Sequence, residues 1–395
     1  MDIAVTILEA ALLCYFGYVA LYTFIFSLGG LFYKSPRTKG GFKEKKFAVM
    51  IPAYKEDGVI FHVAKDALNQ TYDQSNYDVV VIADSLQPAT LKDLATIPVK
   101  TVKVSFEKST KVKALNEAMK RIGDSYDYGV ILDADNVMEP HFLEIMNDLH
   151  QQGYNAIQGR RAAKNENNSL SYLDGLSEEI NNHVYGKGST TLGLSSALKG
   201  SGMSFKYDVL KRMLLRMDSI GGFDRELELR LVGEGTKVKY VSKAIVYDEK
   251  VEKSNVFENQ RKRWISSQFF YLRQYFISGL INLLKGRLTY FNSTVLRNLQ
   301  LPRLINLGLI TVLTFLLFFL QNRLHLPYEA WLLAWSATVM GIVMAIPRSY
   351  YNIRLIKAVF RLPAIFWKMF TLLFKLKDAN KKFIHTPHSS PSQSK

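Results

Sequence analysis

Cysteine and glycine-rich phosphate loops are what this sequence has least of. Its 395 residues include a single cysteine, Cys14, which excludes a disulfide framework and a cysteine-rich zinc site. No G-x-G-x-x-G and no G-x-x-x-x-G-K-[ST] pattern follows a predicted strand, so phosphate binding by loop amides lacks its usual signature. A phosphorylated ligand would have to be bound by other groups, and carboxylates with a divalent cation are the alternative.

Charge is absent from three stretches, 10–33, 304–322 and 330–347. The first is long enough to span a bilayer as a helix. It has neither the basic start nor the small-residue cleavage site of a signal peptide, so we expect it to be retained. The other two stretches are separated by a short loop and predict a transmembrane hairpin.

Basic residues gather beside these apolar stretches. The net charge is +16, and Lys and Arg are frequent in 34–46 and 348–361. Because cytosolic flanks of membrane helices are rich in Lys and Arg, we expect 34–303 to be cytosolic. Anionic lipid attracts such flanks, so the lipid bilayer is the expected partner. Nucleic acid is not, because the basic residues do not form one soluble patch interleaved with aromatics.

Short apolar runs alternate with helical segments in the next part of the chain. The predicted strands are Phe47–Tyr54, Tyr77–Ser85, Thr101–Phe106 and the run that begins at Tyr128. Strands alternating with helices predict right-handed β-α-β crossovers and a mostly parallel sheet. The polar residues that end these strands should therefore collect along one edge of the sheet.

Two carboxylates, Asp133 and Asp135, follow the fourth run in the sequence L-D-A-D-N. Within a strand, residues two apart point to the same side. Two same-facing carboxylates at the end of a buried strand are costly without a cation, and a divalent ion on a diphosphate would compensate them. A solvated turn is the alternative interpretation.

Three later segments each have two interpretations. The small residues Gly200–Gly202 allow close approach of a ligand to the backbone or form an ordinary turn. Asp224 precedes an amphipathic helix and could serve as its N-cap. Gln260–Trp264, Q-R-K-R-W, opens an aromatic helical stretch ending near Tyr275, which could also lie on a membrane surface.

The order of these motifs closely resembles the membrane-integrated family 2 glycosyltransferases, which include cellulose, hyaluronan and poly-N-acetylglucosamine synthases. The resemblance covers 47–275 and rests on P-A-Y-K-E, A-D-S, K-V-K-A-L-N, L-D-A-D-N, G-S-G-M, F-D-R-E-L-E-L-R-L and Q-R-K-R-W. It implies an α/β fold of the GT-A-like nucleotide-sugar transferase type, with a mostly parallel sheet plus transmembrane and interfacial helices.

The resemblance also implies a donor site. The residues expected to line the nucleotide pocket are Pro52, Ala53, Tyr54 and Glu56. Asp84 would hydrogen-bond the uracil or ribose, and Lys111 would be a charge partner near the nucleotide. Asp133 and Asp135 match the D-x-D pair that holds Mg²⁺ or Mn²⁺ on the diphosphate, with Asp135 as the more direct ligand.

For catalysis, the family motif T-E-D followed by x-E-L-x-L-R-L aligns with Gly222–Asp224 and the residues after it. Only the aspartate is retained. Inverting transfer needs a carboxylate to take the acceptor hydroxyl's proton, so we predict Asp224 as the general base. Glu226 or Glu228 is the alternative, although the family gives both positions to helix packing.

Q-R-K-R-W matches a signature that accompanies chain-extending members of the family. Trp264 would stack on a sugar ring, Arg263 would donate to the diphosphate, and Gln260 would add a polar contact. An amphipathic stretch, 362–376, is predicted to lie along the membrane surface. Beyond it, F-I-H-T-P-H faintly resembles the gating loop of cellulose synthases at Phe383, Thr386 and His388.

The predicted protein is a multi-pass inner-membrane enzyme with a cytosolic catalytic domain. It would transfer a sugar, with inversion and a divalent metal, from a nucleotide sugar, expected to be UDP-linked, to a carbohydrate acceptor. That acceptor would be a growing β-linked surface or capsular polysaccharide. The alternatives are a single addition to a lipid-linked acceptor and a membrane module that only senses a nucleotide. Because three spans make a thin channel wall, polymer export would need a homo-oligomer, a secretion partner or interfacial helices.

The predicted division of the chain has six parts. They are an N-terminal transmembrane helix (1–33), a basic cytosolic flank (34–46), a cytosolic glycosyltransferase domain (47–275), interfacial helices (276–303), a transmembrane hairpin (304–347) and a basic cytosolic tail with an amphipathic helix (348–395).

Overall fold

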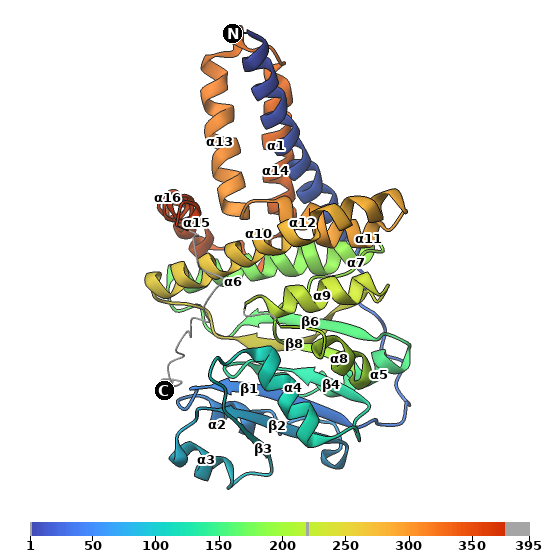
Figure 1. The fold of residues 1–395 in the computed structure, drawn as a ribbon. Coiled ribbons are helices and arrows are strands. Elements are labelled where there is room, and N and C mark those ends of the chain that lie inside the picture. The colour runs from blue at the N-terminus through green and yellow to red at the C-terminus, as the bar shows by residue number, and fades with distance from the viewer. Residues whose placement is uncertain (1, 219–220, 376–395) are drawn as a thin grey trace.

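The computed structural model describes residues 2–218 and 221–375. Figure 1 shows three tiers: an α/β domain, a layer of helices lying across it, and a bundle that rises from this layer. The amino terminus lies at the far end of the bundle. The residues compared with a gating loop, Phe383, Thr386 and His388, lie outside the described residues.

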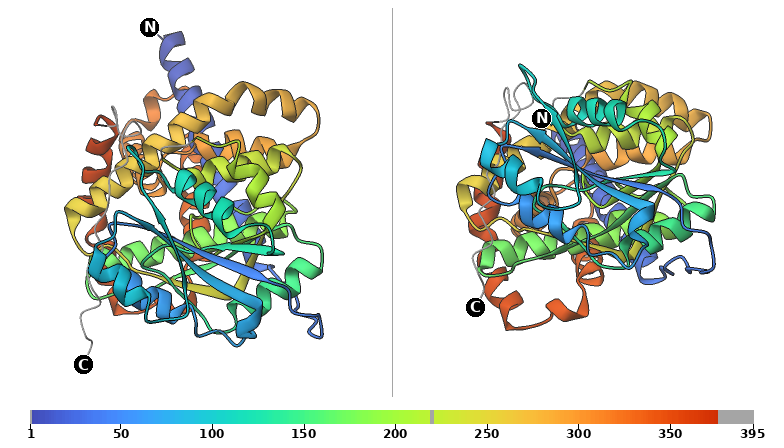
Figure 2. Two further views of the ribbon diagram at one scale, coloured as in Figure 1. Left: turned by 60° about the horizontal axis from the view of Figure 1, so that its bottom comes forward. Right: turned by 90° about the horizontal axis from the view of Figure 1, so that it is seen from below.

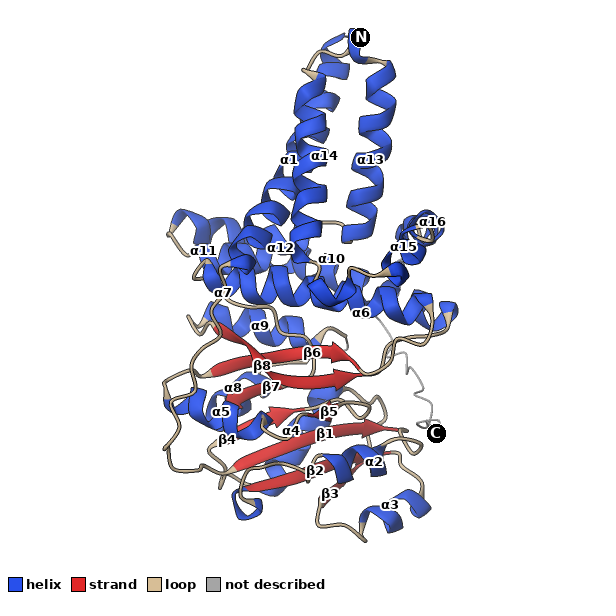
Figure 3. Cartoon of the chain, turned by 180° about the vertical axis from the view of Figure 1, so that it is seen from behind, coloured by secondary structure: helices blue, strands red, loops and turns tan. Residues whose placement is uncertain are grey.

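The α/β domain is built on one eight-stranded sheet in the order β3-β2-β1-β4-β7-β6-β8-β5, seen from behind in Figure 3. The strands are β1 (Phe47–Tyr54), β2 (Tyr77–Asp84), β3 (Lys100–Val104), β4 (Tyr128–Ile131), β5 (Val137–Met138), β6 (Ala156–Ala163), β7 (Met203–Lys206) and β8 (Val238–Asp248). The four predicted strands form its parallel half. The other half is mixed, because β7 is antiparallel to β4 and β6 while β6 is parallel to β8.

Helices cover both faces of the sheet. One face packs against α4 (Lys111–Ile122), α8 (Tyr207–Leu214) and α9 (Phe223–Gly233), and the other against α2 (Ile60–Asp66) and α5 (Phe142–Gln151). A small helix, α3 (Pro88–Leu94), lies after β2. In β1, Ala48 and Met50 enter the first core while Val49 and Ile51 enter the second. This alternation explains why a strand buried on both faces reads as one continuous apolar run.

The middle tier runs across the domain. It consists of α6 (Ser169–Asn181), the π-helical turn 182–188, α7 (Ser189–Thr191), α10 (Ser254–Leu284), α11 (Leu288–Phe291), the π-helical turn 292–296 and α12 (Arg297–Leu299). The helical stretch predicted to end near Tyr275 continues unbroken to Leu284, so that predicted helix end is wrong. The division of the chain at residue 275 stays a prediction. Beyond Tyr275 the helix continues through the mostly aliphatic residues 276–284. Figure 2 shows α10 crossing the domain from two further directions.

The upper tier contains α1 (Asp2–Leu31), α13 (Arg303–Phe319) and α14 (Tyr328–Ala345), with α15 (Ile353–Val359) and α16 (Leu362–Leu373) beside the middle tier. Among the described residues, α1 and α14 are long and apolar enough to cross a membrane. A third span results if the pair 288–299 and α13, bent by 60°, counts as one.

Candidate active site

All of the predicted site residues line one cavity of about 1170 Å³ at the carboxyl ends of β1, β2 and β4. Those residues are Pro52, Ala53, Tyr54, Glu56, Asp84, Lys111, Asp133, Asp135, Asp224, Gln260, Arg263 and Trp264. The structure therefore brings together residues that lie more than two hundred positions apart in the sequence, while the role of each stays a prediction.

The D-x-D pair lies in a turn and not in a strand. Because β4 ends at Ile131, the expected strand alternation does not orient Asp133 and Asp135, and that part of the sequence interpretation is wrong. Tertiary contacts orient them instead. The Asp133 N–H donates to Ser201 Oγ at 2.9 Å, and the Asp133 carboxylate forms an ion pair with Lys111. Lys111 Nζ also donates to the carbonyl oxygen of Gly200 at 2.9 Å.

The segment Gly200–Gly202 needs its glycines. Their φ angles are +85° and +63°, in the left-handed region that side chains disfavour. A Cβ on Gly202 would lie 3.0 Å from Val246 Cγ2. A Cβ on Gly200 would lie 3.7 Å from Asp224 Oδ2 and 4.0 Å from Asp133 Oδ2. Gly200 therefore lies between Asp133, the predicted metal ligand, and Asp224, the predicted base. An ordinary turn would not need to lie between these two residues.

The ends of β1 and β2 are also backbone-strained. Lys55 and Ser85 have φ angles of 56° and 60°, which are uncommon for residues other than glycine. The Lys55 N–H donates to the Asp84 carbonyl oxygen at 3.1 Å, so the two strand ends are joined just past the sheet. Asp84 itself is buried and accepts a hydrogen bond from Ser85 Oγ at 3.1 Å. Strain of this kind is typical of functional sites.

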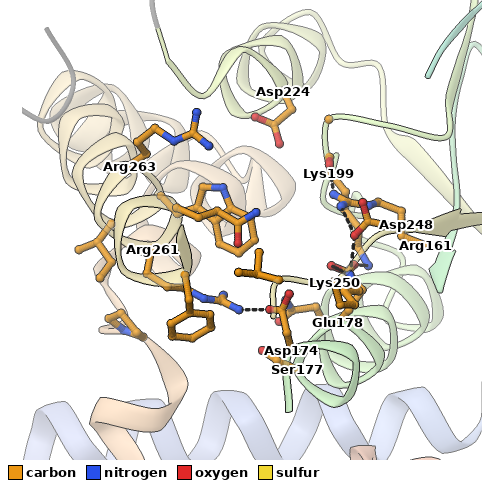
Figure 4. A pocket seen from close by; sticks show the side chains of 18 of the residues that line it. Arg161, Asp174, Ser177, Glu178, Lys199, Asp224, Asp248, Lys250, Arg261 and Arg263 are labelled. Atoms are coloured by element: carbon orange, nitrogen blue, oxygen red, sulfur yellow. Dashed lines mark hydrogen bonds and ion pairs between the residues drawn. The ribbon is translucent and has the colours of Figure 1, made fainter. Parts of the chain in front are cut away.

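Asp224 is the second residue of α9, and the N-cap is Gly222, with a φ of +66°. The interpretation of Asp224 as the N-cap is therefore wrong. Burial raises the pKa of Asp224, and the Asp133 carboxylate adds to this effect, while Arg225 and Lys111 oppose it. Figure 4 shows its carboxylate pointing into the cavity. A buried carboxylate with a raised pKa is a better proton acceptor than an exposed one.

The two alternative bases are both committed to ion pairs. Glu226 pairs with Arg230 at 2.7 Å. Glu228 is buried and receives two hydrogen bonds from Arg297, at 2.6 and 3.1 Å. This second pair joins α9 to α12, so it fixes the helix that carries Asp224 against the middle tier.

The Q-R-K-R-W residues enter the cavity from α10. Trp264 remains 41% exposed, which leaves a face of its ring open. Burial lowers the pKa of Arg263, and attraction to Asp133 opposes this. The sequence did not single out Arg261, whose guanidinium lies 4.5 Å from the Trp264 ring centroid and forms an ion pair with Asp174 on α6. Figure 4 shows Arg261 and Asp174 meeting across the cavity.

A network of buried charges around the end of β8 was also missed. Asp248 pairs with Arg161 and with Lys250, both at 2.6 Å. Glu178 pairs with Lys199 at 2.8 Å and with Lys250 at 3.7 Å (Figure 4). Burial alone would raise the pKa of Asp248, but its two cations outweigh burial and lower it. The one available sequence signal was that Asp248 ends β8 as Asp84 ends β2.

Asn136 connects this network to the D-x-D pair. In the amide orientation that satisfies its hydrogen bonds, Asn136 donates to Asp135 Oδ1 at 2.9 Å and to Asp248 Oδ1 at 3.1 Å, and it accepts from Ser201 Oγ. Asn136 is fully buried and Asp135 nearly so. Asn136 therefore holds Asp135 in one orientation. A solvated turn residue would not need such a buried partner.

Asp133 and Asp135 suit a cation whose remaining ligands are phosphate oxygens and water. In 2–218 and 221–375, no group of three or more His, Cys, Asp or Glu side chains is arranged to hold a metal. Two carboxylates in a cavity wall leave most positions around a Mg²⁺ or Mn²⁺ ion to phosphate oxygens and water. Asp133 and Asp135 thus fit a metal that binds together with a diphosphate.

The mixed sheet with helices on both faces is a nucleotide-sugar transferase fold of the GT-A-like type. The chain belongs to the family described as glycosyltransferase like family 2, whose family model matches residues 45–267. No curated protein sequence matches the chain.

Two solved structures are similar to the chain to different extents. The mannosyltransferase PcManGT from Pyrobaculum calidifontis, in complex with GDP-Man and Mn²⁺, is 16% identical with a TM-score of 0.56, covering 96% of this chain and 98% of its own. Glucosyl-3-phosphoglycerate synthase from Mycobacterium tuberculosis, with Mn²⁺ and UDP, is 14% identical with a TM-score of 0.39, covering 59% of this chain and 85% of its own. The first likeness extends over nearly the whole chain, including its helical tiers.

Proposed function

We propose that the protein is a membrane-bound, metal-dependent, inverting glycosyltransferase that uses a UDP-sugar. The observation that carries this proposal is the shared cavity, in which the D-x-D turn and Asp224 lie on either side of Gly200. A donor sugar whose diphosphate is bound at Asp133 and Asp135 would place its anomeric carbon near Asp224. Transfer then needs an acceptor hydroxyl between the anomeric carbon and Asp224.

On the donor side, Asp133 and Asp135 would hold Mg²⁺ or Mn²⁺, and Lys111 would move from Asp133 to the diphosphate when the metal binds. The Mn²⁺ in the PcManGT complex supports the choice of metal. A divalent ion stabilises the charge that builds up on the leaving nucleoside diphosphate. Asp84, at the end of β2, would accept hydrogen bonds from the base or ribose.

On the acceptor side, Asp224 would take the proton of the attacking hydroxyl as the general base. Its place as the second residue of α9 puts it beside Gly200, and Trp264 offers a flat surface on which the acceptor sugar can stack. A growing β-linked polysaccharide is the first candidate acceptor, because Q-R-K-R-W resembles the signature of chain-extending enzymes. A lipid-linked acceptor is the second candidate, supported by the apolar residues of α13, α14 and α16 in the same cavity.

The decisive measurement is release of nucleoside diphosphate from a panel of UDP- and GDP-sugars, with Mn²⁺, with Mg²⁺ and with EDTA. We expect release from one UDP-sugar that EDTA abolishes. Nucleotide binding without release from any donor and acceptor extract would instead favour the nucleotide-sensing module. Product length then separates the acceptors, since a ladder of lengths from one donor indicates polymerisation.

The membrane arrangement is also a proposal: an inner-membrane protein with 34–303 on the cytosolic side. It can be tested by cysteine labelling in a Cys14→Ser background. An impermeant reagent added to intact cells should label Asn322→Cys, beyond α13, and not Thr191→Cys, at the end of α7; both positions are exposed. Labelling of Thr191→Cys alone would reverse the orientation.

A further inference from the structure

The cavity is larger than a donor site requires. Its volume of about 1170 Å³ exceeds the roughly 300–1,000 Å³ of a typical small-molecule pocket. It also has two unlike ends. One end holds the D-x-D turn and Asp224, and the other continues between the middle and upper tiers of the molecule.

Apolar side chains make up the second end. They come from helices that the sequence separates widely: Leu173 and Ile180 of α6, Leu304 and Leu307 of α13, Ile342 and Val343 of α14, and Ile365 and Met369 of α16. Sugar hydroxyls would gain nothing from such a wall, whereas a hydrocarbon chain would be removed from water along it. Because α13 and α14 belong to the candidate spans, this wall continues into the apolar tier.

Arg303 lies where the two ends meet. It is the first residue of α13, lines the cavity, and donates from Nη2 to Asn181 Oδ1 at 2.5 Å. Its other hydrogen-bond partner is the Tyr185 side chain. Arg303 forms no ion pair with any residue in the described ranges. Both hydrogen-bond partners are neutral, and Glu178 acts on Arg303 only as a nearby charge. This guanidinium is therefore available to an anionic ligand.

Arg261 adds a second cation to this region. One of its nitrogens pairs with Asp174, but its Nε is buried and has no hydrogen-bond partner among the described residues. Arg297 is likewise paired with one carboxylate, that of Glu228. Of these three arginines, Arg303 is the one with no ion pair to a described residue, and Arg261 lies close enough to repel it. A phosphate between the catalytic end and the apolar end could therefore contact both guanidinium groups.

We propose that the acceptor is a lipid with a phosphate headgroup, bound with its phosphate at Arg303 and Arg261 and its hydrocarbon chain along α13, α14 and α16. This inference rests on the proposed function and chooses between its two acceptors. The part of the headgroup that carries the acceptor hydroxyl would then extend towards Asp224. A bare polysaccharide would use neither the free cation nor the apolar wall.

The test uses the full chain in nanodiscs with radiolabelled phytanyl phosphate, a long-chain alkyl phosphate, as the probe. The parent protein should bind it, and Arg303→Gln should weaken binding by about 10- to 100-fold, the usual effect of losing a charge-assisted hydrogen-bond pair. Arg303→Lys should retain part of the affinity. The matched control is Arg354→Gln on α15, an exposed arginine that does not line the cavity and should change nothing.

Two competitors of phytanyl phosphate distinguish recognition of the hydrocarbon chain from recognition of the phosphate. Phytanol has the chain without the phosphate and should compete poorly, and inorganic phosphate should compete only at far higher concentration. A Leu307→Trp variant, which fills the apolar end, should weaken phytanyl phosphate binding and leave UDP binding unchanged. Competition by inorganic phosphate as strong as that by the probe would overturn the proposed lipid site.

The donor readouts keep this inference separate from the proposed function. UDP binding with Mn²⁺ and slow hydrolysis of the donor should be the same in Arg303→Gln as in the parent, which also shows that the variant folds. If UDP binding and donor hydrolysis are normal while phytanyl phosphate binds the parent and Arg303→Gln equally, the lipid site is refuted and the proposed transferase function is unaffected. If neither protein binds or hydrolyses any nucleotide sugar, the proposed function itself fails.

Discussion

The two ends of the cavity are built in different ways. At the donor end, short segments follow β1, β2 and β4. The sheet register pairs Tyr54 with Asp84, and Asp133 follows two residues after the adjacent β4 ends. At the acceptor end, the lining residues come from helices that are far apart in the sequence, α6, α10, α13, α14 and α16. The donor end thus uses one local arrangement repeatedly, a polar residue at or just after the end of a buried strand. The acceptor end depends instead on how the helical tiers pack onto the sheet.

The largest effect is expected from the donor end. Asp135→Ala should abolish transfer and metal-dependent nucleotide binding together, because the diphosphate would face Asp133 and Asp84 without the cation's charge. Calorimetry of UDP with and without Mn²⁺ would measure this. Asp124→Ala, at an exposed aspartate paired with Lys211, is the control. Unchanged Mn²⁺-supported UDP affinity in Asp135→Ala would remove the metal assignment.

Asp224 should affect turnover and spare donor binding. A general base contributes a factor of about 10² to 10⁴, and asparagine keeps the size of the side chain, so Asp224→Asn should bind UDP-sugar normally and turn it over that much more slowly. Asp208→Asn is a close control, since Asp208 is also the second residue of its helix, α8, but is exposed. If Asp224→Asn retains more than about a tenth of the parent rate, Glu226 becomes the next candidate.

A smaller effect is expected where the charge network meets the donor end. Asn136→Ala removes the amide that connects Asp135 to Asp248 without removing a charge. Loss of such an outer partner usually weakens metal binding by about 10- to 100-fold. Mn²⁺ titration followed by electron paramagnetic resonance, with UDP present, would detect it. Parent-like Mn²⁺ affinity would show that Asp135 needs no support from the charge network.

The smallest effect concerns pH. Burial raises the pKa of Asp224. As the pH is lowered, this base should therefore become protonated, and activity should fall, at a higher pH than with an exposed aspartate. The raised pKa also means that the native state binds this proton more tightly than the unfolded state. Its contribution to stability is present below the unfolded pKa and lost as pH rises through the folded pKa.

Asp224→Asn should therefore be slightly more stable than the parent at neutral pH and lose this advantage in acid. Urea unfolding of the two proteins at neutral and acidic pH would measure the difference. Equal stability at every pH would show that ionised Asp224 is not penalised by its surroundings.

Much of the donor end could be predicted because its signals are local. The runs 47–54 and 77–84 are apolar since both faces of their strands are buried, and an acidic or polar residue follows each run. Strand alternation was the wrong way to orient Asp133 and Asp135, because the chain leaves the sheet at Ile131 and Ser201, far along the sequence, accepts the hydrogen bond of the Asp133 N–H. The antiparallel strand β7 was missed, because its four residues are too short for a periodic pattern.

By itself the sequence determined the parallel half of the sheet, the apolar helices and the donor motifs, because strand and helix periods repeat every few residues. Only the tertiary structure decided the acceptor end. Arg303 and Asn181 are 122 positions apart, and Lys199 meets Glu178 only because α6 packs beside the strand ends. A buried charge is tolerated or functional according to the partner that folding brings to it, and no local pattern specifies that partner.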